Sequence, residues 1–196
     1  PVEWEDNKIN VLDTPGFFDF EGEVDEAMSV ADGAIIVVSG KAGVEAGTEH
    51  AWDLCEKFHL PRIFFITDMD IDSVSYREVI EDLSERFGKK IAPFNMPLRE
   101  EGELAGYVNV IQKTAFKYQG DDAVEERVPD YSVEYMNQYK DSLMEAVAET
   151  SEEFLDRYLA GDTFSEAEIR AAVRVAISDG SIIPVESGSG LTQRGV

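Results

Sequence analysis

KINVLDTPGFFDF, residues 8–20, places a polar turn directly after a short apolar run. Ile9, Val11 and Leu12 predict a short buried strand. The tetrapeptide Asp13-Thr14-Pro15-Gly16 follows it, so we expect Asp13 at the carboxyl edge of a sheet, where open α/β sheets bind ligands. A carboxylate at such an edge can hold Mg²⁺ through water, and a glycine lets a backbone N–H approach a phosphate.

Apolar runs and helical patterns alternate on either side of this stretch. Residues 2–5 and 8–12 flank the polar pair Asp6-Asn7 and predict an antiparallel hairpin. Ala34–Val38, Ile63–Ile66 and Ile182–Val185 are apolar runs typical of buried parallel strands. Helices are expected at 48–58, at 74–87 with an N-cap at Ser73, and from a hydroxyl cap at Ser165 to residue 177. This order predicts an α/β fold, with flanking helices on a right-handed parallel sheet.

The pattern changes in the middle of the chain. Shorter strands are expected at 91–98, 107–111 and 114–118, followed by helices at 131–148 and 151–158. We therefore predict a core over residues 1–90, a small α+β insert subdomain over 91–164, and a return to the core over 165–196.

Composition excludes several classes of function. The 196 residues carry a formal net charge of −24, which argues against direct binding to nucleic acid or to an anionic membrane. Apolar residues make up 43% of the chain, which is enough for a core, and no stretch has membrane-spanning length. The single Cys55 excludes an internal disulfide and fits a reducing cytoplasm.

Four segments, taken in order, resemble translational GTPases, and elongation factor G most closely. Asp13–Phe20 is similar to the DTPGHVDF switch segment of that family. Glu101–Tyr118 and Leu143–Gly161 resemble the elongation factor G insert, and Ile183–Gly190 resembles the fifth nucleotide motif. The resemblance implies a P-loop GTPase-type fold. Because no GxxxxGK(S/T) phosphate loop occurs, the sheet would be incomplete and the chain a piece of a longer protein.

The resemblance also implies roles for individual residues. Asp13 would hold Mg²⁺ through water, and Gly16, reached through Thr14 and Pro15, would sense the γ-phosphate with its amide. Phe17 stands where the family has the histidine that orients the attacking water, and phenylalanine cannot do this. Thr67-Asp68-Met69-Asp70 stands at the guanine motif NKxD, of which only Asp70 is kept. Ser189-Gly190 stands at the family's Ser-Ala, whose amide contacts the guanine carbonyl.

These departures lead to three functional hypotheses. The first is a piece of an elongation factor G-like protein that uses GTP, GDP and Mg²⁺ when intact, recognises guanine weakly, and as an isolated fragment has no GTPase activity and holds no cofactor. The second is a pseudo-GTPase that serves as an acidic interaction module. The third is a haloacid-dehalogenase-like phosphatase in which Asp68 attacks phosphorus and Asp70 is the acid/base.

Partners follow from charge and from the resemblance. Residues 100–168 hold 18 acidic and 5 basic side chains, which suits a basic protein partner. The resemblance implies the ribosome and its stalk protein. It also places a strand between Lys8–Leu12 and Ala34–Val38 that this chain lacks, so two apolar edges would be unpaired. We therefore expect the fragment to dimerise or to exchange segments.

Overall fold

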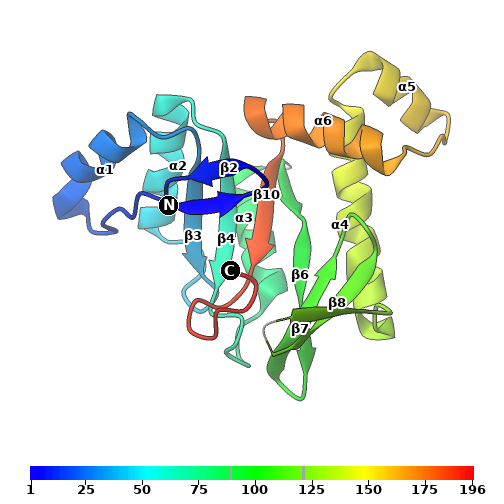
Figure 1. Cartoon of the computed structure of the whole chain (residues 1–196). Coiled ribbons are helices and arrows are strands. Elements are labelled where there is room, and N and C mark those ends of the chain that lie inside the picture. The colour runs from blue at the N-terminus through cyan, green and yellow to red at the C-terminus, as the bar shows by residue number, and fades with distance from the viewer. Residues whose placement is uncertain (89, 121) are drawn as a thin grey trace.

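The computed structural model of the chain describes residues 1–88, 90–120 and 122–196 (Figure 1). A hairpin comes first, a parallel sheet with helices next, and an antiparallel sheet with its own helices is inserted before the last helix and strand. In chain order the elements are β1 (Val2–Trp4), β2 (Asn7–Ile9), η1 (Phe18–Phe20), α1 (Glu21–Met28), β3 (Ala34–Ser39), α2 (Ala46–Phe58), β4 (Arg62–Thr67), α3 (Tyr76–Phe87), β5 (Ile91–Pro93), β6 (Asn95–Glu100), β7 (Glu103–Asn109), β8 (Thr114–Gln119), β9 (Asp122–Glu126), α4 (Asp130–Ala148), α5 (Glu152–Leu159), α6 (Glu166–Asp179) and β10 (Ile183–Ser187).

The core is a parallel sheet with the strand order β3-β4-β10-β5. Side chains from β3 and β4 pack with Trp52 and Cys55 of α2 and with Val79 and Leu83 of α3 in one apolar cluster. These helices therefore bury one face of the sheet, as strand–helix–strand units do. The predicted α/β class with a parallel sheet is confirmed.

Strand β3 is buried on one face only. Ile36 and Val38 lie in the core, but the side chains of Ile35 and Val37 are 63% and 61% exposed. The prediction of a fully buried strand here was wrong. β3 is an edge strand with a single neighbour, β4, and in the described part of the chain no helix shields its second face.

The N-terminal hairpin forms as predicted, with Val2 opposite Ile9, but it is short and exposed. The chain leaves β2 after Ile9, and the side chain of Val11 is 70% exposed. The prediction of a buried strand over residues 8–12 was therefore wrong. This strand pairs with β1 alone, in a separate sheet of two strands, and a two-stranded hairpin has no layer over it to bury its side chains.

The insert sheet has the antiparallel order β6-β7-β8-β9. The apolar run expected as one strand over 91–98 is two strands. Ile91–Pro93 joins the core sheet beside β10, and Asn95–Glu100 joins the insert sheet. The change at Phe94 makes this run the connection between the two sheets. The expected strands 107–111 and 114–118 correspond to β7 and β8, whereas β9 was missed because Asp122–Glu126 is exposed along its whole length.

Helix caps explain where the helices begin. Ser75, not Ser73, caps α3, because its hydroxyl accepts the N–H of Glu78 at 3.3 Å. The predicted hydroxyl cap at Ser165 is confirmed, and Glu168 completes it as a capping box at the start of α6. This helix runs two residues further than expected, to Asp179. Within the described ranges, no helix combines the length and the apolar character that a membrane crossing needs.

Candidate functional site

Two of the three predicted site segments meet at the carboxyl ends of β4 and β10. The amide of Met69 donates to the carbonyl of Gly188 at 3.1 Å, and the amide of Gly188 donates to the carbonyl of Ile66 at 3.0 Å. The amide of Gly190 donates to the Thr67 hydroxyl at 3.4 Å. These bonds join the loop of residues 67–75, called the first loop, to the loop of residues 188–195, called the second loop. Figure 1 shows both below the sheet.

Asp68 points its carboxylate toward the loop after β3. Its Oδ2 accepts the Ser39 hydroxyl at 2.6 Å, and the Ser39 hydroxyl accepts the amide of Ala42 at 3.3 Å. The backbone of Asp68 is left-handed, with φ of +65°, a conformation that aspartate tolerates better than most residues. Asp68 therefore joins the first loop to the loop after β3. Met69, next to it in the chain, is fully buried and packs in the apolar core.

Asp70 is half-buried in a strongly charged neighbourhood. Burial lowers the pKa of the Arg99 guanidinium, while the carboxylates of Asp72 and Asp70 act against this shift. The first loop therefore places two carboxylates close to an arginine of the insert. A carboxylate there has the chemistry to accept N–H donors from a ligand.

The second loop is closed on itself. The amide of Ser189 donates to the carbonyl of Arg194 at 2.8 Å, and the Ser189 hydroxyl accepts the amide of Thr192 at 3.1 Å. A Cβ at Gly188 would lie 2.5 Å from the Arg194 carbonyl oxygen and 2.9 Å from the Phe65 ring, so only glycine fits there. Ser189 is buried and Gly190 is exposed, which leaves Gly190 at the surface of the loop pair.

The third predicted segment lies apart from the other two. Asp13, Thr14 and Gly16 are exposed and Pro15 is half-buried; Phe17 is 76% exposed. Within the described residues, no hydrogen bond or ion pair joins residues 13–17 to the first or second loop. In Figure 1 the blue segment between β2 and α1 lies on the α1 side, not with the loops below the sheet. The Phe17 ring does not pack into the core of the described residues.

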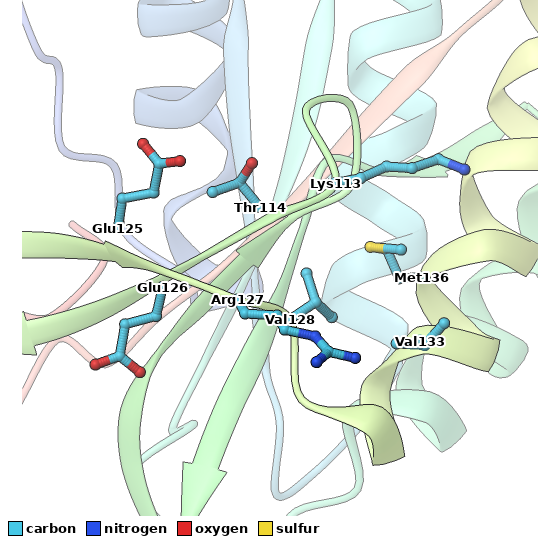
Figure 2. Close-up of a pocket in the computed structure, with 8 residues that line it drawn as sticks. All are labelled: Lys113, Thr114, Glu125, Glu126, Arg127, Val128, Val133 and Met136. Carbon is cyan, nitrogen blue, oxygen red and sulfur yellow. The ribbon is translucent and has the colours of Figure 1, made fainter.

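Two cavities lie in or beside the insert, and the second of them reaches Gly195 of the second loop. An open groove of about 520 Å³ lies in the insert, with Glu126 among its lining residues. In Figure 2, Val133 and Met136 of α4 face Val128 across it. A second cavity, of about 340 Å³, lies where the core and insert sheets meet, and Glu186 and Tyr107 line it. Burial raises the pKa of the Glu186 carboxyl from its ordinary value of 4.5 to about 7.

Across residues 1–88, 90–120 and 122–196, no three His, Cys, Asp or Glu side chains gather as a metal-binding group. A metal held by Asp13 through water would therefore take its other ligands from water or from groups outside the described residues. Mg²⁺ commonly binds in this way, with few protein carboxylates.

Sequence reasoning missed several residues that shape the loops. Ser39, Arg99 and Arg194 each tie a loop to a neighbouring element. Ser39 follows an apolar strand, which is a weak signal for a position at the carboxyl edge. The two arginines carry no local signal, because their partners are carbonyl groups brought close only by the tertiary fold.

Comparison with known proteins finds a matching family model and similar solved structures. The family model of the elongation factor Tu GTP-binding domain matches residues 1–196. A crystal structure of a protein from Thermus thermophilus is similar, with a TM-score of 0.90 and 34% sequence identity. The match covers 97% of this chain and 29% of the Thermus chain, so this chain spans less than a third of the length of that relative.

Proposed function

This chain belongs to the family of the elongation factor Tu GTP-binding domain, the GTP-binding domain of translation factors, and from this premise we propose that it forms the guanine-recognising part of an elongation factor G-like protein. In the intact protein this part would couple GTP binding to action on the ribosome in the cytoplasm. The observation that carries the proposal is the joining of the first and second loops at the carboxyl ends of β4 and β10.

The loop pair suits a guanine base. The Asp70 carboxylate would accept the two N–H donors of guanine, and the amide of Gly190 would donate to its carbonyl oxygen. The amide of Gly190 now donates to the Thr67 hydroxyl at a long distance of 3.4 Å, so guanine binding would exchange this weak bond for one to the base. In the GTP complex, Asp13 would face Mg²⁺ through water, and the Gly16 amide would face the γ-phosphate.

Two substitutions relative to the family argue for weak binding and slow hydrolysis. Asp68 replaces a lysine whose stem would cover the base, and its carboxylate is held by Ser39 instead. Phe17 replaces the histidine that orients water, and its ring has no proton to exchange. Each lost recognition bond costs about 1–3 kcal/mol. The isolated chain has no phosphate loop, so we propose that it does not hydrolyse GTP.

Calorimetry of the intact protein with GDP, GTP and ADP tests nucleotide recognition. We expect GDP to bind with micromolar or weaker affinity and more tightly than ADP. In Asp70→Asn, the affinity for GDP should fall by at least about tenfold, because one acceptor oxygen becomes a donor. The affinity of the same variant for XDP should rise, because the base of XDP presents an acceptor at that position. Equal affinities for GDP and ADP would refute guanine recognition. A sub-micromolar Kd for GDP would refute only the proposed low affinity.

A pseudo-GTPase is the second candidate, and the exposed Phe17 at the histidine position favours it. In this role the domain would be an acidic interaction module that keeps the fold without the hydrolysis. Hydrolysis of GTP by the intact protein with ribosomes separates the two candidates. A rate stimulated by ribosomes as strongly as in other elongation factors would exclude the pseudo-GTPase. The phosphatase hypothesis loses its basis, because family membership accounts for the same Asp68–Asp70 segment.

The insert is the proposed docking surface for a basic partner. Its excess of acidic side chains suits a basic partner and disfavours direct contact with nucleic acid, and the resemblance to elongation factor G points to the ribosomal stalk protein. Co-sedimentation with ribosomes lacking or carrying the stalk checks this proposal. Binding that is independent of the stalk, or that survives in high salt, would contradict an electrostatic stalk contact.

A further inference from the structure

The hairpin β6–β7 of the insert contacts both loops of the candidate site. Its turn and flanking residues, 99–104, receive or donate hydrogen bonds to the first loop and to the second loop. Figure 1 shows the lower end of β6 and β7 beside the loops below the sheet. The insert is therefore joined to the site itself, and not only to the outer surface of the core.

Arg99 of β6 makes the contact with the first loop. Its Nη2 donates to the carbonyl of Ile71 at 2.9 Å and to that of Val74 at 3.4 Å, while its Nη1 donates to Gly102 at 3.2 Å. The carbonyl of Arg99 accepts the Tyr131 hydroxyl of α4 at 2.9 Å. A single arginine thus links the helix of the insert to the loop that carries Asp70.

The turn of the hairpin packs tightly against the same loop. A Cβ at Gly102, where φ is +87°, would lie 2.8 Å from Oδ1 of Asp72. The backbone conformation therefore favours glycine at this position, whereas the exposed Asp72 carboxylate could move aside. The turn of the hairpin thus lies directly beside the first loop.

Arg194 makes the matching contact from the second loop. Its Nη1 donates to the carbonyl of Leu104 in β7 at 2.6 Å, and its guanidinium lies over the Tyr118 ring at 5.5 Å. Its own carbonyl accepts the amide of Ser189, so the residue that reaches the insert also closes the loop.

The other end of the hairpin is attached to the core as well. The Asn95 Oδ1 accepts the Ser187 hydroxyl of β10 at 2.7 Å, and the Asn95 carbonyl accepts the Tyr76 hydroxyl of α3 at 2.7 Å. The hairpin is therefore held at both ends, and a displacement of one loop relative to the other would break contacts with it.

We propose that hairpin β6–β7 sets the spacing between Asp70 and Gly190, with Arg99 and Arg194 as positioning residues, so that base selection in the core depends on the insert. The inference rests on the proposed guanine-binding function. Hydrogen bonds weaken steeply with misalignment, so a loop shifted by about 1 Å would lose its discrimination between bases. Contacts of the phosphates would be unaffected, because neither arginine lies near residues 13–17 in the chain or in the contacts described.

Competition binding of GDP and IDP to the intact protein tests this proposal. IDP lacks the exocyclic amino group whose N–H would donate to the Asp70 carboxylate. The ratio of the Kd values for IDP and GDP therefore reports on the position of Asp70. We expect Arg99→Ala and Arg194→Ala each to reduce the preference for GDP over IDP about five- to tenfold, mainly by lowering the affinity for GDP. Arg194→Lys keeps a cationic donor for the single carbonyl of Leu104 and should restore most of the preference.

Arg77→Ala is the matched control. Arg77 also joins core to insert, since its Nη1 donates to the Tyr135 hydroxyl of α4 at 2.7 Å, but it links helix to helix and not a loop. The preference of the Arg77→Ala variant for GDP over IDP should stay at the wild-type value.

The possible results separate the inference from the function on which it rests. Failure of the wild-type protein to bind either nucleotide would remove the proposed function and this inference together. Binding of GDP and IDP with equal affinity would overturn the inference and leave nucleotide binding in place. An unchanged preference in Arg99→Ala and Arg194→Ala, or an equal loss in Arg77→Ala, would also overturn it.

Discussion

At the scale of single residues, Glu186 makes stability depend on pH. It lies on β10, at the cavity where the two sheets meet, and Tyr107, Asn95 and Asn109 face it across that cavity. Burial raises the pKa of its carboxyl to about 7, so the folded state holds the proton more tightly than the unfolded chain. Stability from this group is present below about pH 4.5 and is lost as the pH rises through 7.

Glu186→Gln should remove this dependence, because glutamine resembles the protonated acid. We expect the variant and the wild type to unfold at similar denaturant concentrations at pH 5. By pH 8 the variant should be the more stable, by at most about 3 kcal/mol. Chemical denaturation across this range measures the difference. The exposed Glu103→Gln is the control for lost negative charge, and parallel curves for all three proteins would contradict the assignment.

At the scale of elements, Gly106 determines how closely β7 and β8 approach. It lies opposite Lys117 in the insert sheet, and a Cβ there would overlap the carbonyl oxygen of Phe116 and lie 2.9 Å from the Lys117 Cα. Backbone atoms on the partner strand cannot move aside as a flexible side chain can. We predict that Gly106→Ala lowers the free energy of unfolding by about 1–3 kcal/mol or more.

Gly22→Ala supplies the comparison for Gly106→Ala. Gly22 lies in α1 with open space around its Cβ position, so alanine should be neutral or stabilising by up to about 1 kcal/mol. Denaturant unfolding followed by circular dichroism measures both variants. If Gly106→Ala unfolded at the wild-type midpoint, the close approach of β7 and β8 would not be a constraint on this sheet.

The elements also show where sequence reasoning succeeded. The strand runs at Ala34 and Ile63, and the capping box at Ser165, were predictable because periodicity and cap chemistry are local properties. The division of residues 91–98 between two sheets was not predictable, because it depends on pairing with β10, more than ninety residues further along the chain. Burial of residues 9–12 failed for a related reason, since burial requires neighbours that no local pattern specifies.

The candidate site divides in the same way. Motif spacing placed Thr67–Asp70 and Ser189–Gly190 in loops that do meet, because the carboxyl ends of parallel strands share one edge. The two arginines that join these loops to the insert were not predicted. Arg99 and Arg194 act through backbone carbonyls, and any residue type can offer a carbonyl.

At the scale of the whole molecule, the exposed edge of the core sheet predicts self-association of this 196-residue chain. β3 offers unpaired backbone groups along one side, and Ile35 and Val37 project from it into solvent. Light scattering should show a dimer or a larger species at micromolar concentration, and Ile35→Lys with Val37→Lys should shift it toward the monomer. Val175→Lys with Leu191→Lys changes the charge equally at exposed apolar sites elsewhere. An equal shift in that control, or a monomeric wild type, would contradict an edge-mediated contact.

The strand order of the core has a consequence for how the protein is made. β10 lies between β4 and β5 and is the last of these strands to leave the ribosome. A nascent chain can therefore pair β3 with β4, and can complete the local hairpins β6–β9, long before the central gap is filled. Until residue 187 has been synthesised, β4 and β5 each have an unpaired edge. A chaperone that covers these edges during elongation would therefore raise the fraction of the protein that reaches its native form.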